Sequence, residues 1–450
     1  MNNSLLSPIK ELPNTLSKLY IDNINSTKYA YNILKMCNNK ITLINEVNKL
    51  PNNCRIGILI PRNGLTNRQC QALSLLYKEN GELYKQFQLN GGDTHMTFDD
   101  DLLYWNGSCL DENECVQLLP KMIHGIYKLK ERTDKMNKLL EYKMNIHNWL
   151  NQINGDNECF KEREEITKVI YTKKHHNSPL NIDNINNAIK KSIHLSTQHI
   201  IVTSGISKTK MNHLSSHIQN ILSSYISKNT MKTTPLIPKY KTIERRSYIT
   251  GECYTNIKLF FPSFPWSSPN TPSFNLLNEI FGAATPFSAG GPGKGIFARS
   301  YERIMKKKGY IASCRTLNFP SKYHGLFGFD FTCFMNEKET LFDIFDTIHQ
   351  MKKDLSQSEL QRAKNILIRK ILFNLGNNSS RVEDAAKSYY YFNRVIGENY
   401  VDMIEKVTID DIYKSIHHMI SHKDKAMLFI QGNKNKIDKI PKLKEALKLL

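Results

Sequence analysis

Isoleucines recur every three or four residues in two stretches that lie far apart along the chain. The first stretch is NIDNINNAIKKSIHLSTQHIIVTSG, residues 181–205, and the second is TIDDIYKSIHHMISHKDKAMLFIQG, residues 408–432. This spacing predicts an amphipathic helix in each stretch, with a capping oxygen from Asn181 or Thr408. The apolar run that follows each helix and ends at a glycine predicts a strand.

The two stretches align without a gap at a constant offset of 227 residues, which places Ile182 on Ile409 and Gly205 on Gly432. The other predicted elements also follow one order in both halves of the chain. Strands are predicted at 54–61, 94–100 and 102–110, and again at 256–262, 311–319 and 325–334; helices are predicted at 68–79, 112–130 and 136–150, and again at 273–282, 338–354 and 358–375. The repeated order predicts an internal duplication. The predicted fold class is α+β, with two homologous sandwich halves, each a mainly antiparallel sheet with helices packed on one side.

The domain boundaries follow from composition. Residues 1–20 are rich in serine and asparagine and lack a long apolar core, so they are a possible targeting or disordered segment and no secretory signal. The predicted N-terminal half is 21–226 and the C-terminal half is 247–450. The polar stretch 227–246 between them contains Pro235 and Pro238, which is typical of a linker.

Charge and cysteine content narrow the class of protein. The 450 residues include 62 Lys and Arg against 42 Asp and Glu, a net charge of +20, but the excess is spread along the chain. A dedicated nucleic-acid groove usually needs a localised basic patch, so we predict no nucleic-acid partner. No apolar run reaches the roughly 18–20 residues of a transmembrane segment. The nine cysteines are an odd number without a C-x-x-C pair, which favours small core residues in a reducing compartment.

A cluster of glycines, FSAGGPGKGIF at residues 287–297, raises a question of chemistry. A phosphate-binding P-loop would require glycine at Ser288 and a hydroxyl residue at Gly295, and a dinucleotide motif would require glycine at Ile296. Both nucleotide interpretations fail. A surface turn and a lid remain open, and the bare backbone of such a lid could hydrogen-bond an extended peptide.

The longer stretch GAATPFSAGGPGKGIFARSYERI resembles the glycine-rich loop of the α subunits of mitochondrial processing peptidases, in the pitrilysin-like family of metallopeptidases. The resemblance also covers LNGGDTHMTFDDDLLYW and spans about residues 50 to 435. Residues 283–286 and Ile296 differ from the family loop. The substrate-binding positions that the resemblance implies are Gly282, Phe287, Ser288, Ala289, Gly290, Gly291, Pro292, Gly293, Lys294 and Gly295. Lys294 is the one charged residue among them, and it either contacts the substrate or solubilises the loop.

Catalytic members of this family bind zinc through H-x-x-E-H on the first helix of the first half. The corresponding helix here, at about 67–79, contains no histidine, and the first histidine of the chain is His95. Two histidine pairs have i, i+4 spacing, His213 with His217 and His418 with His422, but neither pair encloses a glutamate. We predict that the first pair lies at the solvent edge and that the second lies at a helix C-terminus, where cations are favoured. We therefore expect no catalytic residue and no metal in this chain, which should not cleave peptides alone.

The resemblance implies a non-catalytic, substrate-recognising α subunit that forms a heterodimer with a homologous, zinc-bearing β subunit. The pair would remove N-terminal targeting peptides from imported precursors, which the glycine-rich loop would grip or gate. The implied location is the matrix of a mitochondrion or of a reduced, mitochondrion-related organelle, with peripheral association with the inner membrane as a further option. The alternative is a structural core subunit of the cytochrome bc1 complex.

The net positive charge of the chain does not match what a basic substrate would require. Targeting peptides are basic, and like charges across an interface reduce affinity. The acidic clusters Asp99 to Asp101 and Glu162, Glu164 and Glu165 are predicted to be solvated faces. We therefore expect the partner to carry most of the negative potential.

Overall fold

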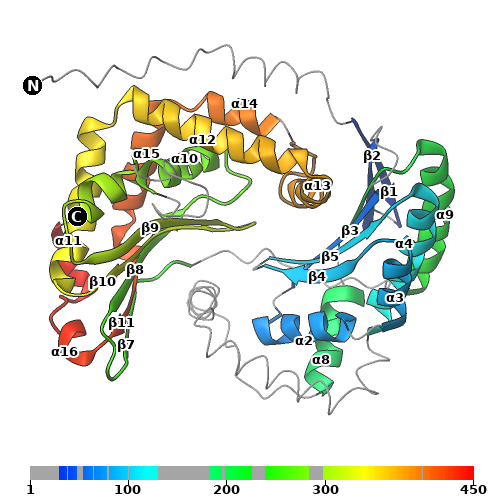
Figure 1. Ribbon diagram of the computed structural model, residues 1–450, viewed down its shortest axis with the longest axis horizontal. Coiled ribbons are helices and arrows are strands. Elements are labelled where there is room, and N and C mark those ends of the chain that lie inside the picture. Colours follow the sequence, from blue (N-terminus) through cyan, green and yellow to red (C-terminus); the bar gives the residue numbers. More distant parts are fainter. Residues whose placement is uncertain are drawn as a thin grey trace, which may run out of the picture.

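The computed structural model describes residues 30–37, 39–47, 54–63, 65–78, 81–99, 101–129, 182–194, 198–225, 239–282, 297–397 and 399–449. These residues form two α/β units that follow one another along the chain (Figure 1). Among them, no helix is both long enough and apolar enough to cross a bilayer. The predicted segment at 1–20, the predicted helix at 136–150, Asn181 and the acidic residues 162–165 lie outside the described residues.

The N-terminal half contains a six-stranded sheet in the order β1-β2-β6-β3-β5-β4. Only β2 and β6 run parallel, and the other neighbours are antiparallel. One face of the sheet forms a continuous apolar core with the helices of this half. The elements are β1 Ala30–Met36, β2 Ile41–Val47, β3 Cys54–Pro61, α2 Asn67–Lys78, α3 Gly81–Leu89, β4 Thr94–Phe98, β5 Leu102–Cys109, α4 Glu112–Tyr127, α8 Ile182–Ile189, a π-helical segment Lys190–His194, β6 His199–Ser204 and α9 Lys208–Tyr225.

The C-terminal half contains a five-stranded sheet in the order β7-β11-β8-β10-β9. Strands β7 and β11 are parallel, and the other pairs are antiparallel. A second apolar core fills the space between this sheet and its helices. The elements are β7 Ile243–Tyr248, β8 Thr255–Ser263, α10 Thr271–Phe281, a π-helical segment Ser300–Met305, β9 Ile311–Pro320, β10 Gly325–Cys333, α11 Glu337–Asp354, α12 Gln357–Gly376, α13 Asn378–Phe392, α14 Asn399–Glu405, α15 Ile409–Ser421, a 3-10 turn Lys423–Lys425, β11 Met427–Gly432, α16 Lys434–Ile437, α17 Leu443–Ala446 and a 3-10 turn Leu447–Leu449.

The two sheets have one topology, so the predicted duplication and fold class are confirmed. Strands β2, β6, β3, β5 and β4 correspond in order to β7, β11, β8, β10 and β9, with the single parallel pair at the same place. The repeated stretches form α8 with β6 and α15 with β11. Thr408 caps α15 as predicted, because its side chain accepts a hydrogen bond from the backbone of Asp411. The first copy differs at its end, where the helix widens into a π-helical segment.

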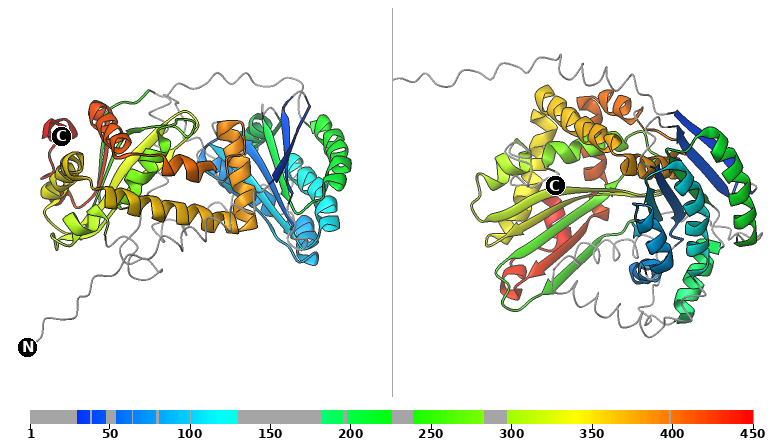
Figure 2. Two further views of the ribbon diagram at one scale, coloured as in Figure 1. Left: turned by 90° about the horizontal axis from the view of Figure 1, so that it is seen from above. Right: turned by 45° about the vertical axis from the view of Figure 1, so that its right-hand side comes forward.

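Helix α13 joins the two halves. It belongs to the C-terminal half but packs on the face of the N-terminal sheet that the sheet's own helices leave uncovered (Figures 1 and 2). The helices are therefore not confined to one side of that sheet. The shared apolar cluster contains Ile44, Leu59, Leu102, Tyr104, Ile200 and Val202 from the sheet and Val382, Ala385, Ala386, Tyr389 and Tyr390 from the helix.

A buried ion pair and a glycine fix the position of α13. Arg381 Nε lies 2.6 Å from Glu46 Oε1 across the seam, with both side chains almost fully buried. Gly57 on β3 lets the helix approach, because a Cβ there would lie 2.8 Å from Val382 Cγ1 and 2.7 Å from the hydroxyl oxygen of Tyr104. Side-chain atoms do not approach so closely in relaxed structures, so this seam requires glycine.

Three local features differ from the sequence-based expectations. The hairpin of β1 and β2 was not predicted, although its turn is marked by Asn39 with φ of 64°. Strand β7 begins at Ile243, so the end of the predicted linker is paired with β11. The described cysteines are free and most are buried, as expected for core residues, but Cys253 is exposed.

Candidate functional site

The glycine-rich segment begins at Gly282, the C-terminal cap of α10. Gly282 has φ of 142°, and a Cβ at this position would collide with Oγ of Ser300 and lie 3.4 Å from Cβ of Ala298. Its N–H donates to the carbonyl of Asn278 and its carbonyl accepts from the N–H of Thr316, at 3.0 and 2.9 Å. Only glycine suits this position. Because Gly282 contacts Ala298, the segment between them starts and ends at one point of the scaffold.

The other end of the segment is held by arginines. Arg362 donates to the carbonyl of Phe297 at 2.6 Å, and its guanidinium lies 5.8 Å from the centre of the Phe297 ring. Arg299, which is 2% exposed, pairs with Asp354 at 2.6 Å and with Glu359 at 2.7 Å. The predicted binding positions Phe287 to Gly295 lie outside the described residues. Of the predicted site, the structure therefore places Gly282 alone, at the root of the segment.

The histidines do not form a zinc site in the described residues. His95 lies on β4, and His213 and His217 are exposed on α9, as predicted. The described parts of the chain contain no group of three or more His, Cys, Asp or Glu side chains that could hold a metal ion. Helix α2, at the position of the family's zinc motif, contains no histidine. The residues present there do not fit zinc.

His418 corrects a prediction. Burial, together with His422 and Lys425, lowers the pKa of His418 to about 4. Its ring lies 4.3 Å from the ring of Phe264, measured between ring centres. It is therefore neutral at physiological pH and is a packing residue, not a cation at the end of a helix dipole.

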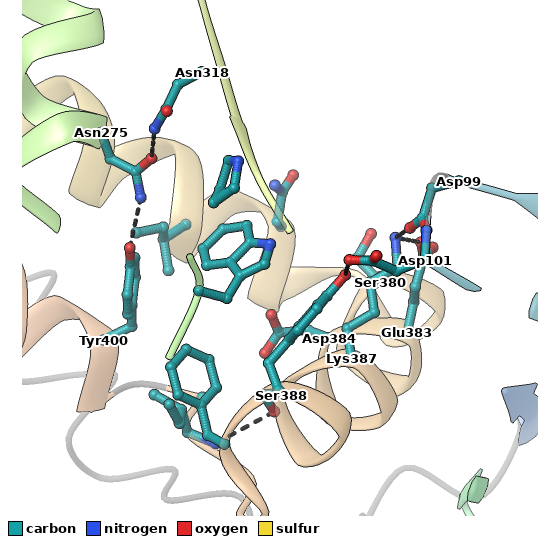
Figure 3. A pocket seen from close by; sticks show the side chains of 18 of the residues that line it. Asp99, Asp101, Asn275, Asn318, Ser380, Glu383, Asp384, Lys387, Ser388 and Tyr400 are labelled. Atoms are coloured by element: carbon teal, nitrogen blue, oxygen red, sulfur yellow. Dashed lines mark hydrogen bonds and ion pairs between the residues drawn. The ribbon is translucent and has the colours of Figure 1, made fainter. Parts of the chain in front are cut away.

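A cavity of about 670 Å³ opens between the two halves (Figure 3). The N-terminal half contributes Asp99 and Asp101, from the turn between β4 and β5. The C-terminal half contributes residues of α10, α12, α13, α14 and the end of β9. The cavity has the size of pockets that bind small ligands or side chains, roughly 300–1,000 Å³.

The acidic turn of the N-terminal half is engaged with the C-terminal half, contrary to the prediction of a solvated face. The carboxylate of Asp101 accepts hydrogen bonds from Ser321 Oγ, from the N–H of Lys322 and from the hydroxyl of Tyr391, at 2.7, 2.9 and 3.2 Å. Burial raises the pKa of Tyr391 far above its usual range, and the neighbouring carboxylates add to the rise, so its hydroxyl stays protonated and donates.

A cation lies beside this turn. Lys387 Nζ pairs with Glu383 at 2.7 Å and with Asp99 at 3.3 Å. Burial opposes the charge, but Asp99 and Glu383 outweigh it and raise the pKa of Lys387. These three charges therefore satisfy one another at one side of the cavity (Figure 3).

Asp384 differs from its acidic neighbours. In Figure 3 it points into the open part of the cavity, and none of the described residues is recorded as its hydrogen-bond or ion-pair partner. Loss of surrounding water raises the pKa of Asp384 to about 6; Lys387 opposes this rise and Glu383 adds to it. Asp384 is exposed to solvent, and Lys387 interacts with it through charge without a recorded ion pair.

The cavity and the root of the glycine-rich segment share two elements. Asn275, at the cavity, lies seven residues before Gly282 on α10, about 10 Å along the helix axis. Asn318 on β9 donates to Asn275 Oδ1 at 2.7 Å, and Thr316 Oγ1, on the same face of β9, donates to the carbonyl of Asn278 at 3.1 Å. The segment therefore leaves the scaffold close to the cavity.

The comparisons with known proteins agree with this architecture. Residues 179–367 match the family model of the Peptidase M16 inactive domain. The mitochondrial-processing peptidase subunit alpha of Neurospora crassa is 28% identical over 166 residues, which cover 35% of this chain and 29% of that protein. The subunit alpha of Caenorhabditis elegans is 29% identical over 153 residues, covering 34% and 30%. The chain thus spans less than a third of the length of these curated relatives.

Solved structures share the whole fold. A protease from Helicobacter pylori matches with a TM-score of 0.68 at 12% identity, over 90% of this chain and all of that one. A chain of complex III2 from Candida albicans, with Inz-5 bound, matches with a TM-score of 0.69 at 11% identity, over 93% and 99%. The fold and its duplicated sheets are thus shared with a bacterial protease and with a chain of complex III. The curated relatives confirm the predicted resemblance to the α subunits of mitochondrial processing peptidases.

Proposed function

We propose that this chain is the substrate-recognising, non-catalytic α-type subunit of a mitochondrial processing peptidase, which removes targeting peptides from imported precursors. The main support for this proposal is the similarity of the chain to α subunits from a fungus and a nematode. The first helix of the first half supports a non-catalytic role, because no histidine stands at the position of the zinc motif. In this proposal the bound zinc, and the water that it activates, belong to the partner.

The proposed partner is a homologous, zinc-bearing β subunit, and the proposed location is the mitochondrial matrix or its equivalent in a reduced organelle. Phe287 to Gly295 would hold the precursor through backbone hydrogen bonds. The fixed root supports this role, since Gly282 and Ala298 are in contact and anchored on both sides. A segment that leaves and re-enters a rigid scaffold at one point can change its sequence without disturbing the core.

The second candidate is a structural core subunit of a respiratory complex, which the fold match to a chain of complex III2 supports. Deletion of Phe287 to Gly295 separates the two candidates, because Gly282 and Ala298 remain bridged by the residues left between them. Precursor cleavage by the reconstituted pair should fall by about a hundredfold while the pair still assembles, because the substrate is no longer positioned. Replacement of Lys294 by serine in the intact loop is the control for charge alone. Unchanged cleavage after the deletion would favour the scaffold.

A further inference from the structure

We propose that one exposed face of helix α12, together with the end of the glycine-rich segment, docks a second protein chain that presents an acidic and apolar surface. This arginine face consists of Arg362, Ile366, Arg369, Phe373 and Phe297. The inference rests on the proposed function for the identity of the second chain, which is the zinc-bearing subunit. It rests on the residues of the face alone for the chemistry of the surface that it fits.

The arginine face follows one stripe of a long helix. Its four members on α12 stand three or four residues apart, so their side chains share one side of the helix. The opposite side is buried in the C-terminal core through Leu360, Ala363 and Ile368. A groove of about 470 Å³ follows the first part of the stripe and is lined by Ser358, Gln361, Arg362, Asn365, Ile366 and Arg369. The stripe is therefore the solvent side of α12.

The apolar members of the face are more exposed than a folded chain alone explains. Phe373 is 83% exposed, the largest fraction among the exposed large hydrophobic residues that the structure describes, and Phe297 is 56% exposed. The stripe extends roughly 16 Å from Arg362 to Phe373. Single exposed apolar residues are ordinary. Two phenylalanines that flank two arginines match the residue types enriched where protein chains meet.

The charged members of the face are cations without a matching carboxylate. Arg369 is exposed and has no recorded ion pair among the described residues. Arg362 donates to the carbonyl of Phe297 at 2.6 Å, and none of the residues that line the groove is acidic. Arginine pairs with carboxylates through two parallel hydrogen bonds. A complementary partner therefore presents carboxylates to this stripe.

Position identifies the partner as the chain that receives the peptide. Phe297 is two residues after Gly295, the last of the predicted binding positions. Because Gly282 contacts Ala298, residues 283–297 close a loop whose tip, at about 3.3 Å per residue, lies no more than roughly 25 Å from its root. A subunit that cleaves a peptide held by this loop must approach the root. The arginine face is an exposed surface that borders it.

Three other occupants fit less well. A second copy of this chain would bring together two molecules that each have a net charge of +20. A basic targeting peptide would meet the two arginines with like charge. An anionic membrane is bound by clusters of roughly four to eight lysines and arginines. The face has two, because the neighbouring Lys370 is paired with Glu279 at 2.6 Å.

The first test measures the dissociation constant of the complex between the full chain and the zinc-bearing subunit, by surface plasmon resonance. Arg369→Glu should weaken the complex by at least about tenfold, because like charges would then face each other. Lys85→Glu is the matched control. It changes the net charge equally at an exposed position of α3 in the other half, and should leave the constant unchanged. Equal weakening by the two variants would overturn the proposal.

The second test removes the aromatic anchor. Phe373→Ala should weaken the complex by about tenfold, as expected for an anchor residue of an interface. Leu89→Ala should leave it unchanged, since Leu89 is 74% exposed at the end of α3. An unchanged dissociation constant in either Arg369→Glu or Phe373→Ala, with a native circular dichroism spectrum, contradicts the assignment. The absence of a stable complex of the parent chain also contradicts it.

A membrane is tested separately, by sedimentation with vesicles of phosphatidylcholine and phosphatidylserine. Vesicle binding by the parent that is lost in Arg369→Glu, with unchanged affinity for the subunit, would overturn the proposal in favour of a membrane. Vesicle binding that is absent, or equal in the parent and in Arg369→Glu, supports the protein partner.

The outcome can be told apart from that of the processing role. If the variants weaken the complex but deletion of Phe287 to Gly295 leaves precursor cleavage intact, the processing role fails and the docking surface stands. If cleavage depends on the loop but the variants leave the affinity unchanged, the docking surface fails alone.

Discussion

The two faces of helix α13 carry charged groups in opposite situations. One face packs on the N-terminal sheet, and its charge, Arg381, is matched by Glu46 in a buried pair. The other face lines the cavity, and Asp384 there has no recorded partner among the described residues. Breaking a buried ion pair leaves an uncompensated charge in the interior, whereas water screens an exposed charge. The first face therefore holds the halves together through a buried pair, while Asp384 on the second face is exposed and needs no partner.

The largest expected effect comes from breaking the pair on the first face. Arg381→Met should lower the free energy of unfolding by about 3–5 kcal/mol, because Glu46 would remain buried without a cation. Lys414→Ala removes an exposed pair with Asp411 and should cost at most about 1 kcal/mol. Denaturant titration measures both. If Arg381→Met lowered the free energy of unfolding by less than Lys414→Ala does, the packing of α13 on the N-terminal sheet would not depend on this ion pair.

Close packing at the same seam gives the next effect. Gly57→Val should cost about 1–3 kcal/mol, since its Cβ would press on Val382 and Tyr104. Gly81→Ala is the matched control, because a Cβ at Gly81 meets nothing within 4 Å and alanine favours the first turn of α3. Thermal unfolding measures the change. Equal stability of the two variants would show that α13 is not tightly held.

The smallest effect belongs to the second face and depends on pH. The pKa of Asp384 is raised to about 6 from 3.8, so between these values the folded state keeps a proton that the unfolded state has released. Its contribution is thus most favourable below pH 4 and is lost as pH rises through 6. Asp384→Asn should gain stability relative to the parent across this window, by about 1 kcal/mol or less because cavity solvent screens the charge. Denaturant midpoints of the variant and the parent at pH 4 and pH 7 test the direction of this change. A variant that is less stable than the parent at pH 7, compared with pH 4, would contradict the prediction.

The sequence predicts the duplicated fold because strong local periodicity recurs at a fixed offset, and nearly every predicted strand and helix in the described residues is present. It does not predict α13, although RVEDAAKSYYYF alternates apolar and polar positions with a helical period. The position of helix α13 depends on its packing against the opposite half of the chain. Local sequence patterns do not encode such a long-range contact. The same limit hides the cavity, since Asp99 and Asp384 are almost three hundred residues apart and meet through the fold.

The glycine cluster shows the reverse case. Its residues resemble a family loop that is expected to bind an extended peptide. The structure, however, describes only Gly282 of the predicted binding positions. The π-helical end of the first repeated helix and the β1–β2 hairpin were also not predicted from the sequence.

The most direct test of the central claim is zinc analysis of the chain alone and of its complex with the partner, together with precursor cleavage by each. The proposal predicts that zinc follows the partner and that the isolated chain neither holds stoichiometric zinc nor cleaves a precursor. Stoichiometric zinc and unaided cleavage by the isolated chain would contradict it.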